Sequence, residues 1–108
     1  MRERQIYGFL GPTCPCGMRE EWNRSFTERG LNAFFDFYRT RNRHDLELRL
    51  SEMFLHERAG YILDPSLQEL AFDLMDRWDE ETLRLKKVAI VKNEGGIFIG
   101  SQCSFYHH

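Results

Sequence analysis

The chain has 108 residues, enough for one domain with one core, and we expect a single domain over residues 1–108. Hydrophobic residues make up 42% of the chain and charged residues 30%, a balance typical of a globular rather than a disordered protein. The formal net charge of −2 argues against a dedicated nucleic-acid binder, which usually carries a marked basic excess.

No apolar run approaches the roughly 20 residues that a membrane span needs, so we expect no membrane partner. The charged start, residues 1–4, is not followed by the long apolar region of a secretory signal. Three cysteines is an odd number, in a chain with enough apolar residues to fold without bridges. These features predict a reduced, cytoplasmic location.

In the first third of the chain, the spacing of the apolar residues alternates between that of a strand and that of a helix. Residues 6–10 form a short apolar run that ends at a Gly-Pro pair, which predicts a strand and then a loop. Residues 18–29 carry apolar side chains at helical spacing, and Gly30 is placed to end that helix. Apolar residues on both faces of 31–38 predict a strand that is covered on both sides.

The middle of the chain predicts a helix, a strand and a second helix. Asn42 is placed to cap the first of these helices, and residues 59–63 read as the strand. Ser66 and Glu69 match a capping box, in which each side chain satisfies the backbone N–H of the other residue. The apolar stripe expected behind that cap consists of Leu67, Leu70, Ala71, Leu74, Met75 and Trp78.

In the last third, Asp79 is placed to cap a short helix that runs through Leu85. Residues 88–91 predict a strand, the Asn-Glu-Gly-Gly run at 93–96 a turn, and residues 97–99 a strand that pairs back as a hairpin.

The predicted order is β-α-β-α-β-α-α-β-β. Such alternation favours an α/β fold of three layers, α/β/α, with a mostly parallel sheet and one late antiparallel hairpin. The core is expected to contain Phe34, Phe35, Phe37, Ile62, Leu70, Leu74, Ile90 and Val91.

Two groups of side chains suggest sites without any family argument. Cys14, Cys16 and Cys103, together with the terminal histidines, can be interpreted as metal ligands or as a thiol pair. Zinc sites usually separate their cysteines by two to four residues, so we favour the interpretation as small loop residues with no metal bound. A basic cluster of Arg39, Arg41, Arg43 and His44 could bind an anion, but the acidic residues that follow it favour a solvated loop.

The order and several side chains resemble the N-terminal, substrate-binding domain of the shikimate and quinate dehydrogenase family, over about residues 6–104. Residues 6–11 look like the opening strand of that family, and residues 96–100 look like its hairpin. Asn23 and Phe26, followed by Gly30, Leu31 and Asn32, look like the first helix of the family and the Gly-Leu-Asn after it. Asp45, Leu46 and Glu47 look like the start of its second helix. Gly60 and Pro65 look like the segment around the end of its third strand.

The functional positions of the family carry other residues here. The resemblance places the catalytic Lys on Leu67 and the catalytic Asp on Ser104, and neither replacement can perform acid–base chemistry on a hydroxyl. The Ser-x-Ser-Pro loop that holds the substrate carboxylate falls on residues 16–19. The cleft implied by the family would be lined by Cys16, Met18, Tyr61, Leu63, Leu67, Ala89 and Ser104.

A dinucleotide-binding Gly-x-Gly-x-x-Gly is absent, and the chain ends at His108, where the family would enter its nucleotide domain. We therefore expect no cofactor, no metal and no hydride transfer by this chain alone. The expected function is that of a shikimate dehydrogenase-like domain that has lost its catalytic residues and acts in small-molecule binding or regulation.

Three further expectations complete this interpretation. The chain is alternatively a fragment or subunit of a shikimate or quinate NADP-dependent oxidoreductase, or a thiol or metal module built on the Cys-Pro-Cys loop. Because the inferred cleft is apolar, a homodimer or a partner chain is expected to cover it.

Overall fold

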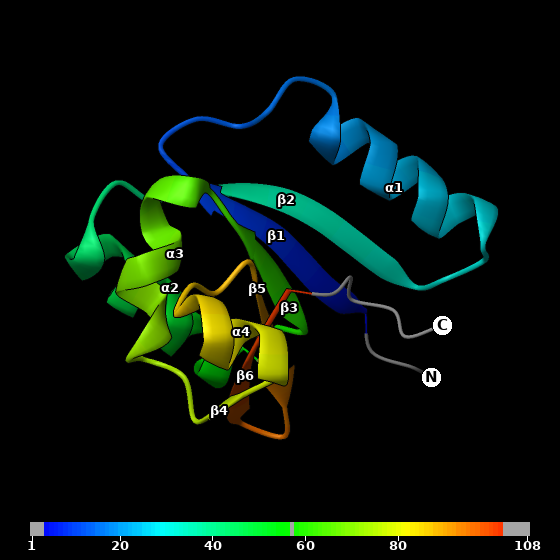
Figure 1. Ribbon diagram of the computed structural model, residues 1–108. Coiled ribbons are helices and arrows are strands. Elements are labelled where there is room, and N and C mark those ends of the chain that lie inside the picture. The colour runs from blue at the N-terminus through cyan, green and yellow to red at the C-terminus, as the bar shows by residue number, and fades with distance from the viewer. Residues whose placement is uncertain (1–3, 57, 103–108) are drawn as a thin grey trace.

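The computed structural model describes residues 4–56 and 58–102 and places four helices and six strands in them (Figure 1). In chain order these are β1 (Gln5–Gly11), α1 (Met18–Glu28), β2 (Ala33–Arg39), α2 (Arg43–Leu55), β3 (Gly60–Leu63), α3 (Pro65–Phe72), β4 (Arg77–Trp78), α4 (Glu80–Leu85), β5 (Ile90–Glu94) and β6 (Ile97–Ser101). Among the described residues, no helix has both the length and the apolar character that crossing a membrane requires.

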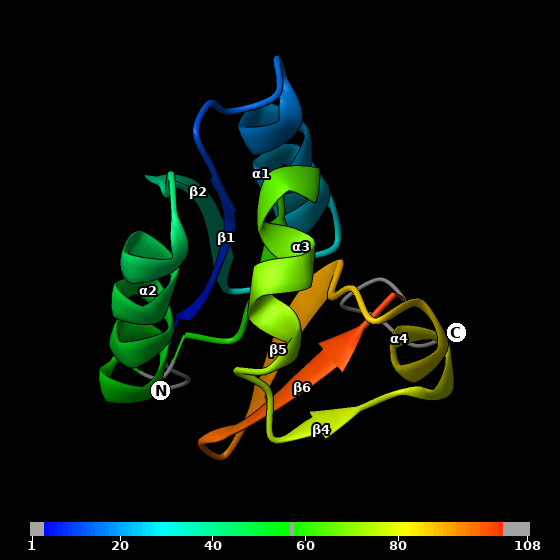
Figure 2. The same cartoon turned by 60° about the vertical axis from the view of Figure 1, so that its left-hand side comes forward.

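The six strands form one sheet in the order β2-β1-β3-β5-β6-β4. β1 pairs in parallel with β2 and with β3, so that Phe9 faces Phe37 on one side and Ile62 on the other. β5 is antiparallel to both β3 and β6, and β4 lies parallel to β6 at the far edge (Figure 2). The predicted α/β class with a mostly parallel sheet and a late hairpin is confirmed.

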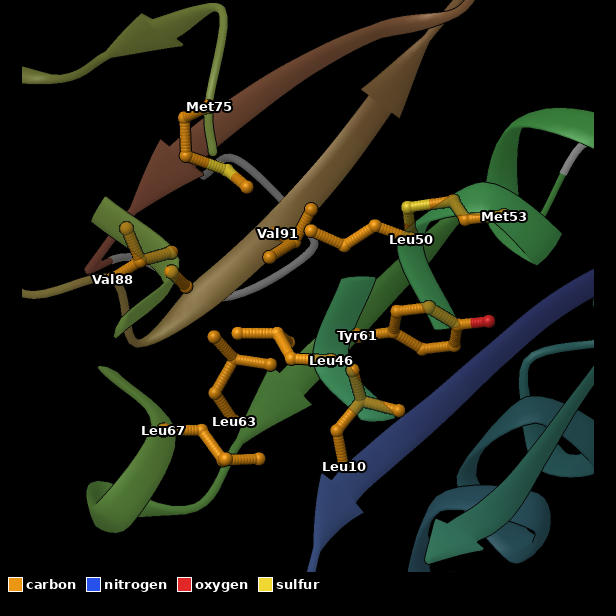
Figure 3. Close-up of a cluster of buried hydrophobic side chains, with 11 residues drawn as sticks. Leu10, Leu46, Leu50, Met53, Tyr61, Leu63, Leu67, Met75, Val88 and Val91 are labelled. Atoms are coloured by element: carbon orange, nitrogen blue, oxygen red, sulfur yellow. The ribbon is translucent and has the colours of Figure 1, made fainter. Parts of the chain in front are cut away.

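Helices cover both faces of the sheet, and each face has its own apolar cluster. On one face α1 packs over β1 and β2, where Phe9, Phe26 and Phe35 are buried. On the other face α2 and α3 enclose a larger cluster, which Figure 3 shows in close-up. Its buried members are Leu10, Leu46, Leu50, Met53, Tyr61, Leu63, Leu67, Ala71, Met75, Val88 and Val91.

Several predicted end signals act as expected. The side chain of Asn42 accepts a hydrogen bond from the backbone N–H of Asp45, which caps α2. Helix α1 ends in a left-handed Gly30 at φ +66°, and the N–H of Leu31 reaches back to the carbonyl of Phe26. This bond, with the N–H of Gly30 donating to the carbonyl of Thr27, forms a Schellman motif.

The helix expected through Trp78 is shorter than predicted, because α3 ends at Phe72 and Trp78 belongs to strand β4. The N–H of Asp76 donates to the carbonyl of Phe98 at 2.8 Å, and the Asp76 carboxylate accepts from the N–H of Phe98. These bonds to β6 compete successfully with continuation of the helix. The indole of Trp78 then donates to the carbonyl of Phe72, which satisfies one carbonyl at the helix end.

The predicted capping box also fails. Asp64 is the N-cap of α3, and its carboxylate accepts from both the backbone N–H and the hydroxyl of Ser66. Pro65 fills the first helical position, where a missing N–H costs nothing.

The predicted core is partly correct. Phe35, Ile90 and Val91 are buried, whereas Phe34, Phe37, Ile62, Leu70 and Leu74 are only half-buried. Phe37 and Ile62 are partly buried and pack against the cluster of Phe9, Phe26 and Phe35 on the α1 side of the sheet. The sequence-based list missed the inward-facing residues of α2, namely Leu46, Leu50 and Met53.

Candidate functional site

The topology singles out the carboxyl ends of β1 and β3. These two strands are parallel neighbours, but the chain leaves β1 for α1 on one face and leaves β3 for α3 on the other. In open α/β sheets, a crevice opens where neighbouring connections diverge in this way, and ligands bind there. We use the name strand-end crevice for this position, where the fold class predicts a ligand; residues 11–17 after β1 and residues 63–66 at the start of α3 lie on either side of it.

The predicted site residues Cys16, Met18 and Ala89 lie around this edge of the sheet. Cys16 is exposed in the loop after β1. Met18 is the first residue of α1 and packs against the cluster of Phe9, Phe26 and Phe35. Ala89 precedes β5, and its carbonyl accepts a hydrogen bond from the N–H of Leu63 at 2.9 Å. Ser104 lies outside the described residues, as do Cys103 and the terminal histidines.

The other three predicted cleft residues point into the core. Tyr61, Leu63 and Leu67 expose 0%, 2% and 1% of their surface and belong to the larger apolar cluster (Figure 3). Their side chains are therefore covered by α2 and α3 within the single chain. A role for them in ligand binding stays a prediction.

The polar groups closest to the crevice are engaged in holding the strand ends together. The N–H of Asp64 donates to the carbonyl of Leu10 at 2.9 Å, while its carboxylate caps α3. A Cβ on Gly11 would lie 2.8 Å from that of Asp64, so only glycine allows this close approach. Sequence reasoning did not assign Asp64 this role, although an Asp-Pro pair is a recognisable cap and first-turn signal.

Gln68 and Asp79 are further polar anchors near the same edge that sequence reasoning did not single out as part of the site. The Gln68 amide donates to the carbonyl of Leu63 at 3.1 Å, and its own backbone carbonyl accepts from the N–H of Val88. Asp79 caps α4 and also accepts from the hydroxyl of Ser101 at 2.7 Å.

The Asp79 carboxylate has a lowered pKa. Partial burial acts to raise the pKa, but hydrogen bonds from Thr82, Ser101 and Gln102 favour the charged form and outweigh that effect. Because each of these donors is a structural neighbour, the lowered pKa is consistent with an anchor that ties α4 to the end of β6.

The position at which the resemblance expects a proton-transferring lysine carries an apolar side chain. Leu67 is apolar, and Lys87 contacts Glu69 at 3.9 Å on the exposed surface. Within residues 4–56 and 58–102, no three His, Cys, Asp or Glu side chains gather into a potential metal site. Cys14 and Cys16 are free thiols, the first half-buried and the second exposed.

No protein family model matches the chain, and no curated protein matches its sequence. Solved structures do match its fold. Shikimate dehydrogenase from Aquifex aeolicus superposes with a TM-score of 0.83 and 22% identity, over 91% of this chain and 37% of that chain. Shikimate 5-dehydrogenase from Listeria monocytogenes, solved in complex with shikimate and NAD, matches with a TM-score of 0.84 and 14% identity, over 91% of this chain and 34% of that one.

A third match is the ligand-free 5-ketofructose reductase of Gluconobacter sp. strain CHM43, with a TM-score of 0.84 and 16% identity. The match covers 92% of this chain and 36% of the reductase. The chain therefore spans about a third of the length of the proteins that it resembles. At these identities the likeness concerns the fold. The resemblance to the shikimate dehydrogenase family predicted from the sequence is therefore confirmed at the level of the fold, for a part of the length of those proteins.

Proposed function

We propose that this chain is a binding domain of the shikimate dehydrogenase type that carries out no hydride transfer of its own. The observation that carries the proposal is Leu67. It occupies the position that the resemblance gives to the catalytic lysine, yet its side chain is apolar and lies inside the core. A group that transfers a proton must be able to ionise and must reach the reacting hydroxyl. A buried leucine meets neither requirement.

The strand-end crevice is where we propose that the small-molecule ligand binds. The fold class favours ligands at this edge, and the loop over residues 12–17 is available to contact them. The matching Listeria enzyme was solved with shikimate and NAD, which makes shikimate the natural first probe. Quinate is the second probe, because the sequence resembles the shikimate and quinate dehydrogenase family.

The first test of the proposal is an activity assay combined with a binding experiment. The chain, mixed with shikimate or quinate and either nicotinamide cofactor, should give no cofactor reduction above a no-protein control. Titration of ¹⁵N-labelled chain with the same acids should shift backbone resonances of residues 11–17 and 63–66, and leave those of β4 unchanged. Cofactor reduction that is lost in a Cys16→Trp variant would contradict the proposal, and so would shifts confined to other surfaces.

A matched pair of variants localises the site. Cys16 is exposed in the loop, so Cys16→Ser should leave binding unchanged and Cys16→Trp should block it without disturbing the core. Leu83→Trp, at an exposed position of α4, serves as the control for a bulky substitution elsewhere. Equal affinity in all three variants would remove the crevice as the ligand site.

A second proposal is that the chain is one part of a shikimate or quinate NADP-dependent oxidoreductase. The observation that favours it is length, because the chain spans only 34–37% of the matching dehydrogenases. The test is co-purification with the product of a neighbouring reading frame, followed by the same cofactor assay on the complex. Cofactor reduction by the complex, but not by the isolated chain, would favour this proposal over the first.

A third proposal, a thiol or metal module, depends on the free Cys14 and Cys16 near the crevice. Zinc titration of the reduced chain, compared with a Cys14→Ser, Cys16→Ser double variant, tests it directly. Identical zinc uptake by both proteins would count against the loop as a metal site.

A further inference from the structure

Strand β2 forms one border of the sheet and has a composition that favours pairing with a strand of another chain. Within the part of the chain that the structure describes, no strand lies beyond it. Four of its seven residues are aromatic, its charges cancel, and it contains neither proline nor glycine. A strand of this kind at the border of a sheet is a template for strand addition, which native proteins normally prevent with their own groups.

The pairing of β2 with β1 identifies the backbone groups that face the open border. Along a strand, successive residues direct their N–H and C=O groups to opposite sides. The N–H of Thr40 donates to the carbonyl of Gly11 at the end of β1, and the carbonyl of Asn32 accepts from the first residue of β1. The even-numbered residues therefore bond to β1, and the odd-numbered residues, Phe35 and Phe37 among them, direct their backbone groups outward.

The side chain of Asn23 on α1 occupies the middle of this border (Figure 1). Its amide donates to the carbonyl of Phe35 at 2.9 Å, and its amide oxygen accepts from the N–H of Phe35 at 2.8 Å. These are the two kinds of bond that an added strand would make with an outward-facing residue. A second chain can therefore pair with Phe35 only by displacing Asn23.

Arg19, one helical turn before Asn23, crosses the same border. Its Nε lies 3.2 Å from a carboxylate oxygen of Asp36, and that oxygen also accepts from the N–H of Phe37 at 2.8 Å. The odd-numbered side chains of β2 face α1, so Asp36 and Phe34 belong to the opposite face. The guanidinium of Arg19 lies 5.9 Å from the centre of the Phe34 ring. Arg19 thus extends from α1 around the border of the sheet.

The two ends of β2 are engaged within the chain as well. At the start, the N–H of Ala33 donates to the carbonyl of Leu31 at 3.0 Å. At the end, the guanidinium of Arg49 on α2 donates to the carbonyl of Arg39 at 3.3 Å. Groups from both faces of the sheet therefore meet the outward backbone of β2 along its length.

We propose that Asn23 and Arg19 together prevent a second copy of this chain from adding its own β2 to this border. Every copy carries the same strand, and an antiparallel pair of β2 strands about a two-fold axis would satisfy both borders at once. This inference is independent of ligand binding at the strand-end crevice. The ion pair of Arg19 is half-exposed and adds little to stability, so its effect belongs to association rather than to unfolding.

Sedimentation equilibrium over a range of micromolar concentrations tests the proposal on the parent chain, Asn23→Ala, Arg19→Ala and the double variant. We expect the self-association constant of the double variant to exceed that of the parent at least about tenfold, with a smaller rise in each single variant. Arg24→Ala, at an exposed position of the same helix, removes the same type of side chain as Arg19→Ala and should match the parent. Circular dichroism establishes that each variant keeps its fold.

Amide hydrogen exchange locates the association. In the double variant the N–H of Phe35 loses its acceptor, so at low concentration it should exchange faster than in the parent and regain protection as the concentration rises. The N–H of Thr40, which is bonded to β1, should not depend on concentration.

A double variant that folds but associates no more strongly than the parent overturns the proposal, and so does association that leaves Phe35 unprotected. If the double variant does not fold, Arg19→Ala decides alone, because it leaves both bonds from Asn23 to Phe35 in place. In that case, association no stronger than that of Arg24→Ala overturns the proposal.

Discussion

Asn23 has a function that only the structure explains. β2 is an edge strand, and edges present unpaired backbone groups that invite pairing with other chains. The side-chain amide of Asn23 on α1 donates to the carbonyl of Phe35 at 2.9 Å and accepts from its N–H at 2.8 Å. One side chain thus takes the place of a neighbouring strand. The sequence identified Asn23 only through a family resemblance, because a contact between a helix and a strand edge leaves no local pattern.

Replacing Asn23 by Ala should lower the free energy of unfolding by about 2 kcal/mol, since two half-buried hydrogen bonds are lost together. Urea denaturation followed by circular dichroism measures the change. Arg24→Ala, at an exposed position next along α1, is the control and should be nearly neutral. Equal midpoints for the two variants would show that the amide does not stabilise the edge.

Tyr61 is the most polar member of the larger cluster. Burial raises the pKa of its phenol to about 12, although the nearby Arg58 guanidinium acts in the opposite direction. The Arg58 guanidinium donates to the Tyr61 hydroxyl at 3.2 Å and lies 4.4 Å from the centre of the Tyr38 ring. The Tyr38 ring itself packs over Gly8, where a Cβ would approach it to 2.6 Å.

The raised pKa of Tyr61 predicts a loss of stability in alkaline solution. The folded state holds the phenolic proton more tightly than the unfolded chain, whose tyrosine has a pKa of 10.0. The stabilisation is therefore complete below pH 10 and decreases as the pH rises toward about 12, by roughly 2–3 kcal/mol in total. Urea unfolding of the chain and of Tyr61→Phe, on both sides of pH 10, measures the difference. Parallel pH profiles for the two proteins would rule Tyr61 out as the source.

At the scale of whole elements, the sequence predicted best where local chemistry decides. The caps at Asn42 and Asp79 and the hairpin turn follow from a few adjacent residues, and each appears as expected. The end of α3 and the existence of β4 did not follow, because both depend on hydrogen bonds to β6, more than 20 residues away. The apolar spacing from Leu67 to Trp78 fits a helix equally well, so periodicity alone could not separate the two outcomes.

The hairpin turn offers a prediction at this scale. Both central residues, Gly95 and Gly96, have positive φ angles, of 62° and 92°. Asparagine tolerates the first angle, and nothing lies within 4 Å of a Cβ added to Gly95. A Cβ on Gly96 would meet the Phe54 ring at 2.9 Å, with a φ angle outside the usual left-handed region.

Gly95→Asn should therefore be nearly neutral, and Gly96→Asn should destabilise the chain by about 1–2 kcal/mol. Thermal unfolding gives the melting temperatures of the two variants and of the parent chain. The comparison is matched, because the same side chain is introduced at two neighbouring positions. The reverse order of stability would mean that the turn has a different geometry in solution.

For the whole molecule, the sequence predicted which strand ends lie side by side, but not which of the predicted cleft side chains turn into the core. Strand order and crossovers bring the ends of β1 and β3 together, and alternation of elements is enough to predict that. Which side chains face the crevice depends on register and helix rotation. Leu67 shows the difference, since it lies at the start of α3 as expected but turns into the core.

The two faces of the sheet should unfold as one unit, although each has a separate cluster. β1 contributes Phe9 to the α1 side and Leu10 to the other, so neither cluster can be lost without disturbing the same strand.

The only two tryptophans report on opposite sides: Trp22 stacks on Phe35 with ring centres 5.5 Å apart, and the ring centres of Trp78 and Phe72 are 5.3 Å apart. Fluorescence-detected urea unfolding of Trp22→Phe and of Trp78→Phe isolates each probe, with circular dichroism of each variant as its own reference. We expect the fluorescence and dichroism transitions to coincide within each variant. A Trp22 signal that is lost at lower urea than the dichroism would mean that α1 detaches first, and that the covering of β2 by Asn23 is a local stabilisation rather than part of one cooperative fold.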